Sequence, residues 1–198
     1  MPRTGLTPDE IRQKAIDATM IEIRTLGFEK VRLTDIAKQL GVSHAALYSH
    51  FKDKSDLLDA VSERWLLKLD ETLEAICSQQ KHPCKKIHSW ALAIHKAKVE
   101  KVRRDPELYR AFDMAAEELK PYVKLHLNSM QRQMCGLVKE VLIRKRRKNM
   151  SVEKIAKIIT TSLAGFHHPR LVLHHIDEKR ENLMHEVIQT VLHGLDLV

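Results

Sequence analysis

The chain has 198 residues, of which 43% are hydrophobic, so it is long enough for one large or two small domains and too apolar for a disordered protein. Only six glycines and six prolines interrupt it, and that composition predicts an all-α fold. The net charge of +8 permits nucleic-acid binding. It does not locate such a site, because residues 1–54 hold nine Lys/Arg against seven Asp/Glu.

Several classes of protein are disfavoured by simple features of the chain. No apolar run reaches the ~18 residues of a membrane span. The first ten residues, MPRTGLTPDE, have no apolar segment typical of a signal peptide. Three cysteines without an obvious pairing scheme favour a reducing compartment. We therefore expect a cytoplasmic protein with no membrane partner.

About nine helices and no strand are predicted in chain order. Thr7, Pro8 and Glu10 form a capping-box start for the first helix, and Gly27 ends it. Proline or a capping residue precedes most of the later helices, and Pro169 is expected to interrupt or kink the penultimate one. The expected helices cover approximately residues 8–26, 33–40, 43–51, 53–78, 84–104, 106–120, 121–148, 151–168 and 183–195.

The junction of the second and third helices has the residues that a helix-turn-helix needs. Ala37 is small enough for crossing helices to approach, and Gly41 permits the left-handed backbone of the turn. The apolar residues expected to fill the junction are Ile36, Leu40, Val42 and Leu47. A helical hairpin with a solvated polar face has similar spacing, so this signal alone leaves both interpretations open.

The residues around this junction resemble the N-terminal domain of the TetR (tetracycline-repressor) family of transcriptional regulators. The matching segments are Gly27-Phe28, Asp35-Ile36-Ala37, Gly41-Val42-Ser43, Leu47-Tyr48-Ser49-His50-Phe51 and Lys54-Ser55-Asp56-Leu57-Leu58. The resemblance covers residues 8–68, with one departure. The family usually has Thr at the start of the second helix, where this chain has Arg32 and Leu33, so we expect Thr34 or Asp35 to cap that helix.

The resemblance implies a DNA-binding domain over residues 8–68, with the helix-turn-helix at about 32–51. Residues 43–51 then form the recognition helix, whose Leu47 and Phe51 face the core. Its small Ala45 and Ala46 let the backbone approach base edges in the major groove. Tyr48, His50 and Lys54 lie where the family contacts phosphates. The expected DNA-binding residues are Thr34, Ser43, His44, Ala45, Ala46, Tyr48, Ser49, His50 and Lys54.

Residues 69–198 are expected to bind an effector and to dimerise, again by resemblance. The dimer face is predicted from two apolar stripes, although both stripes are equally consistent with monomer core: Ile155, Ile158, Ile159, Ser162, Phe166, Val187, Ile188, Val191, Leu192 and Leu195. A second set of residues is expected to contact an unknown small-molecule effector, and ordinary core packing is the alternative for each of them. These residues are Trp90, Ile94, His95, Tyr109, Phe112, His126, Met130 and Met134.

The chain is therefore expected to be a dimeric, ligand-released repressor of a near-palindromic operator on double-stranded DNA. The alternatives are an activator, a metal- or redox-responsive regulator, and a helical small-molecule-binding protein with a vestigial DNA-binding head. Cys77, His82, Cys84 and His88 lack an established zinc spacing, and no motif of an enzyme active site is present. We expect no metal, no cofactor and no catalytic residue. The basic run at residues 144–148 is interpreted as a solvated helix end, with a phosphate contact as the alternative.

Overall fold

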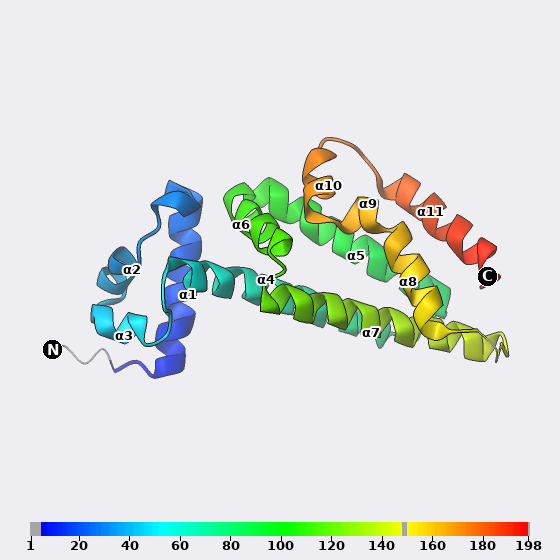
Figure 1. Cartoon of the computed structure of the whole chain (residues 1–198), viewed down its shortest axis with the longest axis horizontal. Coiled ribbons are helices and arrows are strands. Elements are labelled where there is room, and N and C mark those ends of the chain that lie inside the picture. Colours follow the sequence, from blue (N-terminus) through cyan, green and yellow to red (C-terminus); the bar gives the residue numbers. More distant parts are fainter. Residues whose placement is uncertain (1–4, 148–149, 198) are drawn as a thin grey trace. The chain divides into compact units, whose positions relative to one another are not determined.

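The computed structural model describes residues 5–147 and 150–197, which form helices and no strand, as the composition predicts. The described elements, in chain order, are α1 (Pro8–Leu26), the 3-10 turn η1 (Phe28–Lys30), α2 (Leu33–Leu40), α3 (His44–Tyr48), α4 (Lys54–Cys77), α5 (Pro83–Arg104), α6 (Pro106–Glu117), α7 (Pro121–Arg144), α8 (Val152–Ser162), α9 (Ala164–His167), α10 (Pro169–His174) and α11 (Glu181–Gly194). Figure 1 shows their order along the chain.

Local capping signals explain where some of these helices begin. The Thr7 hydroxyl accepts the backbone N–H of Glu10 at 3.3 Å, and the Glu10 carboxylate accepts the N–H of Thr7 at 2.7 Å. This reciprocal pair is the predicted capping box of α1. Ser151 caps α8 by accepting the N–H of Lys154 at 3.2 Å. The predicted starts of α1 and α8 are thereby confirmed.

Three helix ends differ from the prediction. Arg32 is the N-cap residue of α2 and makes no side-chain capping bond, so neither Thr34 nor Asp35 caps that helix. Helix α3 ends at Tyr48 rather than near Phe51. The predicted helix over 151–168 stops at Ser162, because Leu163 leaves helical geometry with φ −91° and ψ 0°.

The interruption at Leu163 also changes the helix count. The short α9 follows it, and extended geometry at His168, the residue before Pro169, separates α9 from α10. The described residues therefore contain eleven α-helices, where about nine were expected. The two additional helices are the four-residue α9 and the six-residue α10.

The chain divides into two compact units. The first, called the head unit below, comprises residues 5–65 and 104–118, with α1, α2, α3, α6 and the start of α4. Within it, α1 packs against α2, α3 and α6. Its apolar core is formed by Ala15, Ile16, Ala18, Ile23, Val31, Leu33, Ile36, Ala37, Leu47, Phe51, Leu57, Ala60, Val61 and Leu108.

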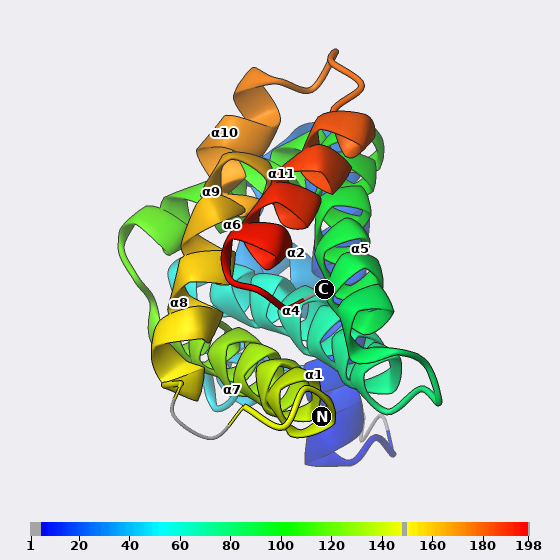
Figure 2. The ribbon, with the colours of Figure 1, turned by 90° about the vertical axis from the view of Figure 1, so that its right-hand side faces the viewer.

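The second unit, called the body unit, comprises residues 66–103 and 119–197. It contains the rest of α4, nearly all of α5, and α7 through α11. Helix α8 packs against both α7 and α11, and Figure 2 shows α8 and α11 side by side. Its core includes Leu69, Leu73, Ile87, Trp90, Ile94, Met134, Leu137, Val138, Ile159, Leu163, Phe166, Ile188 and Leu192.

The head unit includes α6. The expected domain boundary, between residues 68 and 69, would instead put α6 in the C-terminal domain. An ion pair attaches α6 to α1, because Asp105 precedes α6 and Arg24 lies in the last turn of α1. Arg24 Nη2 donates to Asp105 Oδ2 at 2.9 Å, and Arg24 Nε donates to the other carboxylate oxygen. Hydrogen bonding to Asp105 is the main cause of the raised Arg24 pKa.

Two glycine substitutions test this backbone description. Gly41 has φ +66° and ψ +23° at the end of α2, so Gly41→Ala should lower the free energy of unfolding by about 1 kcal/mol. Gly136 lies in α7, where an added Cβ would have no neighbouring atom within 4 Å. Gly136→Ala should therefore raise the free energy of unfolding by about 0.5–1 kcal/mol. Urea unfolding followed by circular dichroism measures both. Equal effects of the same sign would contradict the left-handed turn at Gly41.

Candidate functional site

The helix-turn-helix is formed by α2, the turn at residues 41–43, and α3. The N–H of Gly41 bonds to the carbonyl of Lys38 at 3.1 Å, and the N–H of Val42 bonds to that of Ala37 at 3.1 Å. Ala37 is only 3% exposed. These contacts close α2 with a left-handed glycine, as the spacing predicts.

Helix α3, the predicted recognition helix, has one buried and one exposed face. Leu47 within it is 0% exposed, and Phe51 just beyond it is 1% exposed. Both side chains belong to the head core, which confirms their predicted orientation. On the other face, His44, Ala45 and Tyr48 are exposed. The head unit therefore presents a short helix whose outer face has small and polar side chains.

Hydrogen bonds pre-arrange this outer face. The Ser43 hydroxyl accepts the N–H of Ala46 at 3.1 Å, which caps α3. The Ser49 hydroxyl donates to the Ala46 carbonyl at 2.8 Å. The rings of His44 and Tyr48 lie one helical turn apart with centroids at 4.5 Å. Each of these residues was predicted to contact DNA, and the structure brings all of them to one short segment.

The remaining predicted DNA contacts surround this segment. Thr34 is exposed near the start of α2, and His50 is half-buried beside Phe51. Lys54 is half-buried at the start of α4, and its Nζ donates to the Glu29 carbonyl at 2.6 Å. An ammonium has three N–H donors, so this bond orients Lys54 and leaves N–H groups for another acceptor.

Two residues predicted for the effector site lie in the head unit. Tyr109 and Phe112 are buried on α6, where their ring centroids are 5.7 Å apart. The ring of Trp65 approaches Phe112 at 4.9 Å and Tyr109 at 6.4 Å. These three rings form an aromatic cluster of the head unit. Helix α6 follows α5 directly in the chain, so sequence reasoning grouped Tyr109 and Phe112 with the effector residues of α5 and missed their place in the head unit.

The other six predicted effector residues lie in the body unit. Trp90, Ile94 and His95 come from α5, and His126, Met130 and Met134 come from α7. All six are buried. Burial is compatible with both of the expected alternatives, an effector site and ordinary core packing.

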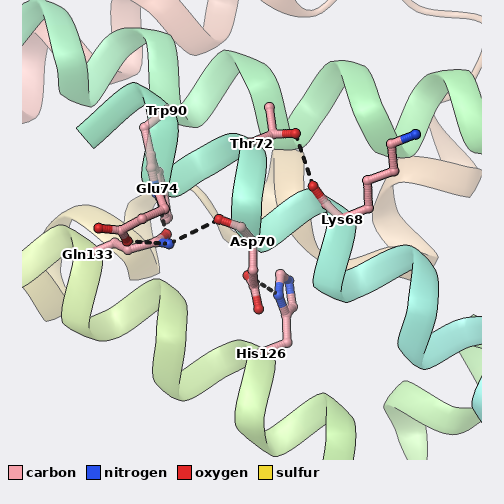
Figure 3. A network of polar contacts seen from close by, with 7 residues as sticks. All are labelled: Lys68, Asp70, Thr72, Glu74, Trp90, His126 and Gln133. Atoms are coloured by element: carbon pink, nitrogen blue, oxygen red, sulfur yellow. Dashed lines mark hydrogen bonds and ion pairs between the residues drawn. The ribbon is translucent and has the colours of Figure 1, made fainter. Parts of the chain in front are cut away.

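A polar network crosses this otherwise apolar interior (Figure 3). Trp90 Nε1 donates to Gln133 Oε1 at 2.9 Å. Gln133 Nε2 then donates to the Glu74 carboxylate at 3.2 Å and to the Asp70 carbonyl at 3.4 Å. The Asp70 carboxylate meets His126 Nδ1 at 2.7 Å. The network thus joins α4, α5 and α7, and sequence spacing gave no signal of it.

Buried basic groups lie near the short α9. His95 Nδ1 bonds to the Phe166 carbonyl at 3.1 Å, and His167 Nε2 bonds to the Ala91 carbonyl at 3.0 Å. Lys98 Nζ donates to the His167 carbonyl. Burial lowers the pKa of Lys98 to about 8. Burial, and next the charge of Lys98, lower the pKa of His167 to about 3.

The predicted dimer stripes are largely core in this structure. Ile155, Ile159, Phe166, Ile188 and Leu192 are each at most 4% exposed and pack inside the body unit. These five side chains cover the unit's own interior, as in the core-packing alternative that the sequence left open. Four others, Ser162, Val187, Val191 and Leu195, are half-buried. Ile158 on α8 is 38% exposed and Leu183 on α11 is 48% exposed, so these two apolar side chains face outward.

The described residues contain no group of three or more His, Cys, Asp or Glu side chains arranged to hold a metal ion. Cys77, Cys84 and Cys135 are free thiols. Burial raises the pKa of Cys77 to about 11 and also raises that of Cys84. Raised thiol pKa values disfavour the reactive thiolate that a redox sensor needs.

Two further sequence features are placed by the structure. In the basic run, Arg147 pairs with Asp196, and Lys145 lies 3.9 Å from the same carboxylate. Lys148, the last residue of that run, lies outside the described residues. Over the described part of the chain, none of the helices combines the length and the apolar character that crossing a bilayer requires.

Comparison with known proteins supports the assignment of the head unit. Residues 15–61 match the family described as bacterial regulatory proteins, tetR family. The HTH-type transcriptional regulator BetI of Yersinia pestis (strain Pestoides F) is 34% identical over 74 residues, which are 37% of this chain and 37% of that protein. The similarity to BetI thus spans little more than a third of either protein.

Two solved structures have a similar fold over nearly the whole chain. The transcriptional regulator FadR from Bacillus subtilis, in complex with stearoyl-CoA, has a TM-score of 0.65 at 19% identity, covering 92% of this chain and 98% of that one. SmeT, the repressor of the Stenotrophomonas maltophilia multidrug efflux pump SmeDEF, has a TM-score of 0.62 at 20% identity, covering 96% and 91%. At these identities the likeness concerns the fold.

The longer family match covers the C-terminal part of the chain. Residues 83–188, more than half of the chain, match the domain described as tetracyclin repressor-like, C-terminal domain. This match and that of residues 15–61 do not overlap, and together they cover most of the chain. The chain therefore belongs to the TetR family of transcriptional regulators.

Proposed function

We propose that this protein is a ligand-released repressor that binds a near-palindromic operator on double-stranded DNA as a homodimer. The observation that carries the proposal is the helix-turn-helix, whose recognition helix buries Leu47 and exposes His44, Ala45 and Tyr48. Phosphate contacts position such a helix, and base contacts select the sequence. Because its target is the chromosome, we place the protein in the cytoplasm.

The roles within the site follow from side-chain chemistry. His44 at the start of α3 can hydrogen-bond to a base edge, and the methyl groups of Ala45 and Ala46 can contact thymine. Tyr48 and Lys54 have donors suited to phosphate oxygens. Thr34, Ser43, Ser49 and His50 complete the proposed contacts. We take residues 8–68 as the DNA-binding domain and residues 69–198 as the effector-binding and dimerisation domain.

A homodimer is proposed because a single α3 of five residues reads too few base pairs for useful specificity. Helices α8 and α11 pack together, and each keeps one outward apolar side chain, Ile158 and Leu183. Pairing both helices with their copies would form a four-helix bundle and cover these side chains. The half-buried Val187 and Val191 would flank the contact.

Release by a small molecule is proposed for the body unit. FadR has been crystallised with stearoyl-CoA, and SmeT is a repressor, so proteins of this fold include both a ligand complex and a repressor. Met130 and Met134 on α7 can repack around an apolar ligand. Release requires the ligand to prefer the conformation that does not bind DNA, because equal affinity for both conformations shifts nothing.

The DNA-binding proposal is tested by selecting bound fragments from a random DNA library and then measuring affinity at several salt concentrations. We expect a short inverted repeat. Lys54→Gln should weaken binding to all sequences and flatten the slope of log K against log salt by about 0.9, the value for one lost phosphate contact. His44→Ala should change which base is preferred at one position in each half-site, at a cost of about 1–3 kcal/mol.

Lys38→Gln is the matched control for charge, because Lys38 is exposed in the last turn of α2 and is not among the proposed contacts. Circular dichroism would verify that each variant folds. Selection of no motif, or unchanged binding in both Lys54→Gln and His44→Ala, would refute the assignment of α3 as the recognition helix.

The dimer proposal is tested by light scattering at micromolar concentration. The wild type should have about twice the chain mass of 22.9 kDa. Leu183→Glu and Ile158→Glu should shift it toward the single-chain mass, because a buried unpaired carboxylate opposes association. Leu125→Glu is the control, since Leu125 is 65% exposed on α7. A wild type with the mass of one chain would rule the bundle out.

A further inference from the structure

His44 is the residue of α3 best placed to read a base through hydrogen bonds. The Ser43 oxygen accepts the backbone N–H of Ala46, and the Ser49 hydroxyl gives its proton to the Ala46 carbonyl. Ala45 and Ala46 offer only methyl groups. His44 is exposed, and within the described part of the chain its ring nitrogens have no hydrogen-bond partner. Readout of a base by hydrogen bonds therefore depends mainly on His44.

An exposed imidazole at this position needs support to select a base. His44 is the first residue of the five-residue α3, so no preceding turn of that helix packs against its side chain. Hydrogen bonds weaken steeply when donor and acceptor are misaligned. A side chain that is free to change rotamer must also lose that freedom on binding. Base selection by His44 thus requires a contact that holds its ring.

The ring of Tyr48 supplies this contact. Tyr48 lies one helical turn after His44, and helical side chains lean toward the N-terminus, so the Tyr48 ring reaches back toward His44. The ring centroids are 4.5 Å apart, and the ring planes are inclined by 52°. Aromatic rings stabilise each other at this separation. No hydrogen bond joins the two described side chains, so both imidazole nitrogens stay available to DNA.

The Tyr48 ring projects from an anchored backbone. Its neighbour Leu47 is 0% exposed and belongs to the head core, which fixes this part of α3. A tyrosine ring has only two side-chain torsions, so holding it in one orientation costs little entropy. The phenolic oxygen lies at the far end of the ring and remains free to bind a phosphate. The ring and the hydroxyl of Tyr48 can therefore have separate roles.

We infer that Tyr48 is a positioning residue for sequence readout: its ring orients the His44 imidazole toward one base pair in each half-site, while its hydroxyl binds a phosphate. The ring then contributes to specificity, and the hydroxyl contributes to affinity alone. This inference rests on the proposed function, in which α3 reads the operator.

Affinities for matched DNA duplexes separate the two roles. The duplexes are the selected operator and its versions with each other base at the pair where His44→Ala loses its preference. The discrimination ratio is the Kd for the best of the substituted duplexes divided by the Kd for the operator. Tyr48→Phe keeps the ring and removes the hydroxyl, whereas Tyr48→Leu removes both. Lys54→Gln is the matched control, because a lost phosphate contact weakens binding to all duplexes alike.

We expect a wild-type discrimination ratio of roughly 5–150, the range for one specific contact with a base. Tyr48→Leu should lower this ratio by about 2- to 12-fold, since an aromatic pair contributes that much. Tyr48→Phe and Lys54→Gln should weaken binding to all duplexes equally and keep the ratio. In the His44→Ala background, Tyr48→Leu should lower the ratio no further, because the imidazole that Tyr48 orients is already absent.

Three results would each overturn the inference, once circular dichroism has shown that the variants fold. A wild-type ratio in Tyr48→Leu would show that the ring orients nothing. An equal loss of the ratio in Tyr48→Phe would assign the effect to the hydroxyl. A further loss in the His44→Ala background would show that Tyr48 reads the base itself.

A measurement on the wild type without DNA keeps the inference testable even if Tyr48→Leu does not fold. Nuclear Overhauser contacts between the ring protons of His44 and Tyr48 are expected in solution, and their absence would overturn the positioning role. Selection of an inverted repeat together with an unchanged ratio in Tyr48→Leu refutes the positioning role alone. Selection of no sequence by a protein whose two rings are in contact refutes the proposed function, and the readout role with it.

Discussion

Helix α4 belongs to both packing units, and the rest of the structure depends on that shared helix. Its first part, beginning at Lys54, is in the head unit, and its second part contributes Asp70 to the body network. The chain thus passes from the head unit to the body unit within a single helix, which contains no proline.

The chain connects the units a second time through the junction of α5 and α6. Asp105 follows α5 directly and is bonded to Arg24 at the end of α1. The carboxylate side chain is 8% exposed and the guanidinium 48%, so the pair is stronger than a fully exposed one. It attaches α6 to the helix against which α2 and α3 also pack. Helix α6 and the first part of α4 therefore both belong to the unit that contains the helix-turn-helix.

Sequence reasoning predicted the features that depend on near neighbours. The α1 capping box involves residues three apart, and the α2–α3 turn is specified by Ala37, Gly41 and Leu47 within eleven residues. The burial of Leu47 and Phe51 followed from their spacing of four. These interactions are local, so the order of residues largely determines them.

Features that depend on distant residues were missed or left open. Asp70 and His126 are 56 residues apart, and Arg24 and Asp105 are 81 apart. Nothing in the spacing of either pair indicates that they meet. The two stripes that contain Ile155 and Ile159 on α8 and Ile188 on α11 could not be assigned to core or dimer face, because periodicity identifies a buried face without identifying what buries it. Only the packing of α8 between α7 and α11 decides that question.

The energetics of release set the free energy that an effector must supply. Moving a two-state equilibrium from 1:99 to 99:1 requires a ligand preference of about 5.5 kcal/mol for one state. A hydrogen bond with charged character supplies about 1.5–3 kcal/mol of that. The remainder, about 2.5–4 kcal/mol, corresponds to roughly 100–160 Å² of apolar surface at 25 cal/mol per Å². Polar and apolar contacts must therefore both differ between the two conformations, because one hydrogen bond alone leaves about half or more of the required free energy unsupplied.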